Sequence, residues 1–440
     1  MELEKERGVS VATSVMCFEY KDKIINLLDT PGHADFSEDT YRTLTAVDSV
    51  LMVIDSVKGV EARTKKLMDV CRLRNIPVIT FINKLDREGR ESFDLLDDIE
   101  QNLNIHAIPL SWPISRGKTF QGVYDIAQKT FLSFKPGAKT FLTETVGSPS
   151  SIPNMEEMYK EQLIKDLEMI EGALLSFDMK EFLAGKMTPV FFGSAINNFG
   201  VYELLTNIIN LAPAPQPRAA AERIVEPAED KMTGIVFKIQ ANMNPRHRDR
   251  IAFMRVNSGK FTRGMKVKNI RQDREFKIMA PLTFMAQTRN LIEEAYPGDI
   301  VGIHDTGLIK IGDTITEGEA LHYTGIPSFA PEAFRLVINR NQQKTKQLNK
   351  GLEQLSEEGA VQLFRTVADN NLILGAVGTL QFEVVQYRLK HEYGADCEYA
   401  DHSKAFAYWF KTENETLLKT FLKERILKLA LDTEQKYIYF

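Results

Sequence analysis

The amino-acid sequence predicts an α/β protein in which a mostly parallel sheet is followed by a small β-barrel and a third α/β domain. Strand-like and helix-like stretches alternate through the first 212 residues, which is the pattern of βαβ units. Short strands separated by glycine turns fill residues 231–322, as in a small barrel. Helical periodicity returns after about residue 331.

The first part is predicted from its apolar runs. Two short runs flank Lys21-Asp22 and predict a hairpin that ends at Asp29. We then expect a helix over 36–46, a strand over 49–54, a helix over 60–74, a strand over 77–82, and a strand at 189–192 followed by a helix. Residues 135–153 are rich in Ser, Pro, Gly and Thr, and predict an exposed insertion.

A proline-rich segment, residues 212–217, is the clearest domain boundary because prolines stiffen a linker. In the last part, amphipathic helices are expected over 344–356 and 381–393. The predicted divisions are a first domain over 1–212, a linker over 213–230, the barrel over 231–328 and the third domain over 329–440.

Composition excludes several classes of protein. The 440 residues are 43% hydrophobic and 26% charged, with a net charge of −5, which argues against wholesale binding to DNA. Three cysteines without a C-x-x-C pair indicate a reducing compartment, so we expect a cytoplasmic protein. The N-terminus does not read as a signal peptide, and no apolar run reaches the roughly 18 residues of a membrane span.

The first motif, Asp29-Thr30-Pro31-Gly32-His33, closes an apolar run. Open α/β sheets bind ligands at such strand ends. We expect Asp29 to hold Mg²⁺ through water, because Mg²⁺ prefers oxygen ligands and keeps much of its hydration. The Gly32 amide can approach a terminal phosphate, and His33 can orient an attacking water. The alternative is an ordinary turn with His33 on the surface.

The second motif, Asn83-Lys84-Leu85-Asp86, follows a buried strand. The Asp86 carboxylate can accept hydrogen bonds from N1–H and N2–H₂ of guanine, which adenine does not offer. Leaving such a buried group unpaired costs about 1–3 kcal/mol, so the carboxylate discriminates between bases. Asn83 can fix the loop, and the Lys84 stem can cover the face of the base.

A third loop, Gly193-Ser194-Ala195, follows another strand and is expected to close over the base. The three loops together predict a site for GTP and GDP with Mg²⁺. The phosphate-binding pattern G-x-x-x-x-G-K-[ST] does not precede the first motif. Gly117-Lys118-Thr119 is interpreted as a coincidence, since Trp112 stands where the pattern needs glycine.

The chain resembles the bacterial translational GTPases of the release factor 3 type. Arg7-Gly8-Val9-Ser10 is similar to the R-G-I-[ST] end of the family's first switch. Further similar stretches span nearly the whole chain: 247–261, 295–304, 329–335, 355–364 and 374–385.

The resemblance implies a P-loop-GTPase-like G domain, a translation-factor β-barrel and an α/β third domain. It implies that Ser10 joins Asp29 at Mg²⁺ and that His33 is catalytic. It further implies GTP-dependent removal of class-I release factors from the ribosome, with rRNA, ribosomal proteins and class-I release factors as partners of a monomer.

This sequence departs from the family at both ends. The segment with the family's first strand and P-loop is missing, so the G domain is predicted to be incomplete, with unpaired buried edges on the strands ending at Asp29 and near Asp55. Residues 429–440 resemble the approach to a final strand that does not follow. We therefore expect weak GTP binding and hydrolysis. The alternative function is a non-enzymatic ribosome-binding fragment with an inert G-domain remnant.

A basic stretch is a candidate rRNA contact. Residues 245–277 contain eleven Lys and Arg but three Asp and Glu, a local charge of +8. The alternative is a solvated barrel face. The candidate contacts are Arg246, Arg248, Arg250, Lys260, Lys266 and Lys268.

Overall fold

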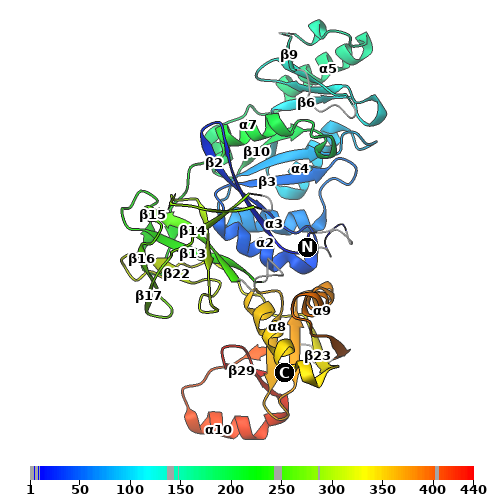
Figure 1. Cartoon of the computed structure of the whole chain (residues 1–440). Coiled ribbons are helices and arrows are strands. Elements are labelled where there is room, and N and C mark those ends of the chain that lie inside the picture. The colour runs from blue at the N-terminus through cyan, green and yellow to red at the C-terminus, as the bar shows by residue number, and fades with distance from the viewer. Residues whose placement is uncertain are drawn as a thin grey trace. The chain divides into compact units, whose positions relative to one another are not determined.

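The computed structural model describes residues 4, 8, 10–135, 143–146, 148–241, 250–285, 288–401 and 406–440. The chain divides into two compact units (Figure 1). Unit 1 comprises Met1–Ala46 and Pro215–Phe440, and unit 2 comprises Val47–Ala214. Within the described residues, no helix combines the length and apolarity needed to cross a membrane.

Unit 2 contains the predicted parallel sheet. Its strands lie in the order β3 (Val50–Asp55), β4 (Val78–Asn83), β10 (Met187–Phe192) and β5 (His106–Pro109). The strands are nearly continuous apolar runs, as expected where both faces of a sheet are covered. The helices are α3 (Ala62–Leu73), α4 (Ser92–Leu103), α6 (Met179–Leu183) and α7 (Val201–Leu211). Asp55 pairs with Asn83, so β3 and β4 end side by side.

A second sheet in unit 2 was not predicted. It is antiparallel, in the order β6 (Ser111–Ile114), β7 (Gly122–Asp125), β8 (Thr130–Ser133) and β9 (Thr143–Thr145). Figure 1 shows β6 and β9 grouped with α5 (Glu157–Ala173). The buried Trp112 indole donates to Asp166 of α5 at 2.9 Å. Of the predicted insertion, residues 136–142 and 147 lie outside the described residues.

Unit 1 begins with the predicted hairpin. Strand β1 (Ser14–Tyr20) pairs antiparallel with β2 (Lys23–Asp29). Lys21 and Asp22 have φ of 47° and 59°, as a two-residue turn of type I′ requires. The helix expected over 36–46 is instead α2 (Ser37–Thr43) between two 3₁₀ turns, η1 (Ala34–Phe36) and η2 (Leu44–Ala46).

The two predicted strand edges are unpaired, but they are not buried. Among the described residues, β2 pairs with β1 alone and β3 pairs with β4 alone. Ile24 and Leu27 of β2 are 61% and 40% exposed, and Val53 of β3 is 54% exposed. Solvent can therefore satisfy part of these edges, which lowers the cost that we expected from buried ones.

The barrel region forms an eight-stranded antiparallel sheet, as the glycine-punctuated pattern predicted. Its apolar core includes Val236, Met254, Val301 and Ile315, all fully buried. The sheet order is β17 (Arg274–Lys277), β16 (Lys266–Asn269), β22 (Thr314–Thr316), β13 (Thr233–Ala241), β14 (Arg250–Ser258), β21 (Ile300–His304), β18 (Leu282–Met285) and β19 (Thr288–Leu291). Strand β15 (Phe261–Thr262) pairs with β20 (Glu294–Ala295).

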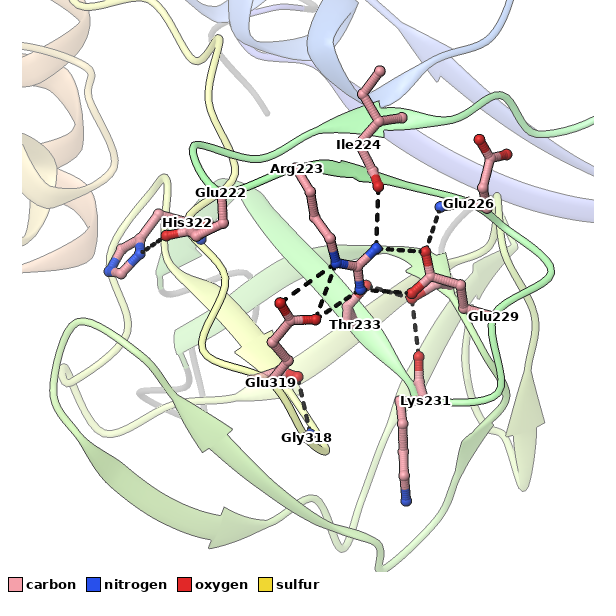
Figure 2. A network of polar contacts seen from close by, with 12 residues as sticks. Glu222, Arg223, Ile224, Glu226, Glu229, Lys231, Thr233, Gly318, Glu319 and His322 are labelled. Carbon is pink, nitrogen blue, oxygen red and sulfur yellow. Dashed lines mark hydrogen bonds and ion pairs between the residues drawn. The ribbon is translucent and has the colours of Figure 1, made fainter.

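Half of the predicted linker is folded. Strands β11 (Arg218–Ala219) and β12 (Ile224–Val225) form a small hairpin. Figure 2 shows the Arg223 guanidinium between two carboxylates, with 2.7 Å to Glu229 and 2.7 Å to Glu319. These ion pairs attach the hairpin to residues on both sides of the barrel sequence, so only the prolines before it lack regular structure.

The third region is a seven-stranded sheet with helices. Helices α8 (Thr345–Glu357) and α9 (Leu380–Glu392) confirm the two amphipathic predictions. The order is β26 (Cys397–Asp401), β23 (Ala333–Asn339), β25 (Leu372–Ala376), β24 (Gln362–Thr366), β28 (Leu429–Leu431), β29 (Tyr437–Tyr439) and β27 (Tyr408–Trp409), with α10 (Glu415–Glu424) between β27 and β28. The expectation for 429–440 was wrong, because this segment itself supplies β28 and β29.

The N-terminal hairpin packs on the barrel within unit 1. Val15 of β1 shares an apolar cluster with Phe253 and Phe284. The Asn26 side chain donates to Asp299 at 3.1 Å. The first 46 residues, assigned from sequence to the same domain as 47–212, thus bury their apolar side chains against residues after 215.

Candidate guanine-nucleotide site

Two loops of unit 2 meet at the carboxyl ends of β4 and β10. Asn83 ends β4, and its side-chain oxygen accepts from the amides of Lys84 at 2.7 Å and Ala195 at 2.8 Å. The Leu85 amide also donates to the Gly193 carbonyl at 3.2 Å. The structure thus brings together Asn83–Asp86 and Ser194–Ala195, which the sequence predicted as separate pieces of one site.

A hydroxyl group orients the carboxylate predicted to read the base. Ser194 is fully buried and donates from Oγ to Asp86 Oδ1. The Asn197 side chain donates in turn to Ser194 Oγ at 2.8 Å, a contact that no sequence motif indicated. Asp86 Oδ2 takes no hydrogen bond from the described residues. A half-buried carboxylate with a fixed orientation and one open oxygen suits N–H donors of a ligand.

Gly193 is needed for the two loops to approach each other. A Cβ at this position would lie 2.5 Å from the Phe199 carbonyl oxygen and 2.7 Å from the Phe81 ring. Both distances are shorter than real carbon contacts. The glycine therefore permits the contact between the loop after β10 and the loop after β4.

Lys84 has an unusual conformation in this loop. Its φ is 72°, in the left-handed region, and its ammonium lies 2.6 Å from Asp55 Oδ2 at the end of β3. Burial alone would raise the pKa of Asp55, but the hydrogen bonds from Lys84 and from the Val57 amide lower it. The sequence analysis missed Asp55, although its place at a strand end was a signal.

The first motif lies in unit 1, between β2 and α2. Asp29 ends β2 and is exposed, yet neighbouring atoms partly desolvate its carboxylate and raise its pKa, and Glu4 adds like-charge repulsion. The Pro31 carbonyl accepts from the Thr40 hydroxyl at 3.4 Å, which ties the loop to α2. Nothing lies within 4 Å of a Cβ built on Gly32, so its backbone is open to a ligand. Thr30 is half-buried beside them.

His33 is 45% exposed and caps the 3₁₀ turn that follows it. Its Nδ1 accepts the Asp35 amide at 3.2 Å. In a neutral ring the proton then resides on Nε2, because Nδ1 is used as an acceptor. The geometry leaves Nε2–H as the donor that His33 can offer to a ligand or water.

The residues predicted to hold Mg²⁺ lie close to one another. Glu4 accepts the Val11 amide at 3.0 Å and also acts electrostatically on Asp29, so the segment with Ser10 lies near that carboxylate. Oxygen donors beside mutually repelling carboxylates fit a cation that prefers oxygen. Arg7 and Val9 of the same motif lie outside the described residues.

Helix α2, which follows the first motif, is fixed to the rest of unit 1. Asp35 accepts the Leu380 amide at 2.7 Å, and Arg42 donates to the Gly359 carbonyl at 3.1 Å. A cavity of about 60 Å³, enough for a few waters, lies beside these contacts. Its lining includes Asp39, Arg42, Lys238, Glu358 and Arg388.

Gly117-Lys118-Thr119 is not a phosphate-binding loop, as predicted. These residues form a 3₁₀ turn, η3 (Gly117–Thr119), between antiparallel strands β6 and β7. A P-loop instead joins a strand of a parallel sheet to a helix. The Gly117 amide donates to the Leu85 carbonyl at 2.8 Å, so this turn supports the base-reading loop.

The basic stretch is largely neutralised. Exposed Lys260, Lys266 and Lys268 form ion pairs with Glu294, Glu275 and Asp273, respectively. The surface role predicted for Arg250 was wrong: its side chain is 5% exposed because it forms ion pairs with Asp305 and Glu357. Arg246 and Arg248 lie outside the described residues.

Comparison with protein families gives three adjoining matches. Residues 1–214 match the model described as the elongation factor Tu GTP binding domain. Residues 231–318 match elongation factor G domain 2. Residues 323–440 match the C-terminal domain of class II release factor RF3.

A solved structure has a similar fold. The crystal structure of ttk003000868 from Thermus thermophilus is 20% identical in sequence and superimposes with a TM-score of 0.74. The match covers 91% of this chain and 60% of that chain. At this level of identity the likeness concerns the fold.

Proposed function

We propose a function on the premise that the chain belongs to the translational GTPases of the release factor 3 type. We infer that it binds GTP and GDP and acts at the end of translation, where it promotes GTP-dependent removal of class-I release factors from the ribosome. The observation that carries this proposal is the Ser194–Asp86 contact, which presents an open carboxylate oxygen in a chain that ends in a release-factor domain.

Guanine fits this oxygen because its N1–H and N2–H₂ groups are adjacent donors. Asp86 can accept both, while Asn83 keeps the loop closed through the Ala195 amide. Each buried hydrogen bond left unmade by a wrong base costs about 1–3 kcal/mol. The same site therefore favours guanine over adenine, which presents no such pair of donors.

For hydrolysis, we assign His33 to the attacking water. Its Nε2–H can donate to that water and orient it, while Nδ1 stays engaged with the Asp35 amide. Asp29 and Ser10 would hold Mg²⁺, which supplies positive charge opposite the phosphate oxygens. The open backbone at Gly32 can approach the terminal phosphate.

Ribosome contact through the barrel is part of the proposal. Lys266 is 61% exposed and Lys268 is 37% exposed; their ion pairs with Glu275 and Asp273 can exchange for pairs with RNA phosphates. We place the protein in the cytoplasm and expect it to act as a monomer.

The test uses purified ribosomal termination complexes that carry a labelled class-I release factor. We expect the full 440-residue chain with GTP to accelerate loss of the label. Asp86→Asn should fail with GTP, and Asp69→Asn, an exposed change on α3, should act like the wild type. Multiple-turnover GTP hydrolysis by the same complexes is measured in parallel.

Two results would contradict the proposal. One is no acceleration by the wild-type chain at any GTP concentration. The other is ribosome binding without guanine-nucleotide binding, which would favour a non-enzymatic ribosome-binding module.

A further inference from the structure

An ion pair joins the ends of two neighbouring strands in unit 2. Asp55 is the last residue of β3, and its register partner Asn83 is the last residue of β4. From the position after Asn83, Lys84 reaches back so that its Nζ lies 2.6 Å from Asp55 Oδ2. The lysine stem therefore runs along the carboxyl edge of the parallel sheet, which is where such sheets bind ligands.

The Asp55 carboxylate is fixed independently of the lysine. Its Oδ1 accepts the Val57 amide at 2.8 Å, and its own carbonyl accepts the Gly59 amide at 2.8 Å. The side chain is 16% exposed. The turn after β3 thus holds one carboxylate oxygen and leaves Oδ2 for Lys84.

The Lys84 backbone is fixed as well. Its carbonyl accepts from Ser56 Oγ at 3.1 Å, and its amide donates to the Asn83 side chain at 2.7 Å. A left-handed φ of 72° persists in a lysine only where the surroundings impose it. Both ends of the side chain are therefore held, the Cα by the loop and the ammonium by Asp55.

We propose that Asp55 is a positioning residue of the guanine-nucleotide site and acts through Lys84. By holding the ammonium, it lays the four-carbon stem across the strand ends, where the stem forms an apolar surface for one face of the base. Asp55 itself does not touch the nucleotide. This inference rests on the proposed function, since it assumes that Asn83–Asp86 bind guanine. The competing view is a half-exposed ion pair of no consequence for binding.

Nucleotide competition distinguishes these views. We would displace a fluorescent N-methylanthraniloyl-GDP from the full chain with GDP, IDP and XDP. Asp55→Asn should weaken GDP and IDP by the same factor, about three- to tenfold, and leave the GDP-to-XDP ratio unchanged. The ratio depends on Asp86, which this change does not touch. Asp69→Asn, which breaks an exposed aspartate–arginine pair in the same unit, is the matched control and should match the wild type.

A double-mutant cycle tests the route of the effect. On a Lys84→Ala background, Asp55→Asn should cause no further loss of GDP affinity, because the residue through which it acts is gone. Losses that add would overturn the proposal, as would an altered GDP-to-XDP ratio in Asp55→Asn alone, because that would mean a disturbed Asp86 loop.

A chemical measurement does not depend on nucleotide. Reductive methylation with formaldehyde, quantified at Lys84 by mass spectrometry, should be several-fold faster in Asp55→Asn than in the wild type or Asp69→Asn, because a salt-bridged amine reacts slowly. An equal rate would overturn the proposal. If the wild type binds no GDP, the proposed function fails in its nucleotide part, and the labelling rate alone decides whether Asp55 positions Lys84.

Discussion

Lys238, on β13, donates from its buried ammonium to the carbonyl oxygen of Thr13. The Thr13 amide donates in the opposite direction to Asp39 of α2 at 2.6 Å. Burial lowers the pKa of Lys238, and the nearby Asp39 carboxylate opposes this shift. One residue before the hairpin therefore connects two buried charges of opposite sign, and each charge compensates the other.

We predict that Lys238→Met lowers the free energy of unfolding by about 3 kcal/mol, because it leaves Asp39 as an uncompensated buried charge. Urea unfolding followed by circular dichroism measures the effect. Lys231→Met is the control: Lys231 is 66% exposed in its pair with Glu317, and we expect a change below about 0.5 kcal/mol. Adding Asp39→Asn to Lys238→Met should restore part of the loss, and a further loss would refute the compensation.

Asp86→Asn should change which base the protein prefers. An amide in place of the carboxylate offers a donor where guanine also has donors, so GTP affinity should fall by about tenfold or more. XTP, whose base carries an oxygen in place of N2–H₂, should gain affinity. Competition against a fluorescent guanine nucleotide gives both constants. Unchanged selectivity would remove Asp86 from base reading.

Gly193→Ala should destabilise unit 2 by about 1–3 kcal/mol, because the added methyl group overlaps the Phe199 carbonyl and the Phe81 ring. It should also weaken guanine-nucleotide binding, since the loop bearing Ser194 must shift. Gly172→Ala is the matched control: it lies in α5 with nothing within 4 Å of its Cβ position, and alanine there should stabilise by about 0.5–1 kcal/mol. Thermal unfolding compares the two, and equal effects would contradict the steric argument.

Glu434 should make a small contribution to stability that depends on pH. Hydrogen bonds from Lys436 and Lys310 hold the pKa of Glu434 at about 2, below its ordinary value of 4.5. A lowered carboxylate pKa stabilises the folded state above pH 4.5, and the contribution disappears as the pH falls toward 2.

Glu434→Gln should thus lower the free energy of unfolding at pH 7 by less than about 1 kcal/mol, because the pair is largely exposed. The difference from the wild type should shrink as the pH is lowered from about 5 to 3. Glu424→Gln, on the exposed side of α10, controls for the loss of one negative charge. A difference that stays constant with pH would show that the ion pairs contribute nothing.

Much of the local structure was predictable because local signals determine it. The Lys21-Asp22 turn follows from two polar residues between apolar runs, and the structure has the expected hairpin. The parallel strands follow from continuous apolar runs. Asn83 and Ser194 were found because each lies directly after such a strand, where parallel sheets collect their polar side chains.

Other features depend on contacts that the sequence pattern does not encode. The strands β6 to β9 have three or four residues each, too few for a clear alternation. Arg250 looked like a surface cation, but two distant carboxylates allow its burial. Asp55 and Asn197 act through contacts with other residues of the loops, and neither belongs to a recognisable motif.

The contacts of the N-terminal hairpin and α2 bear on the order in which the chain can fold during synthesis. Lys238 lies 225 positions after Thr13, Asp299 lies 273 after Asn26, and Leu380 lies 345 after Asp35. Loop closure over such distances is slow and entropically costly. The segment made first on the ribosome therefore waits for most of the chain before it finds its native neighbours, and until then it is a natural target for chaperones.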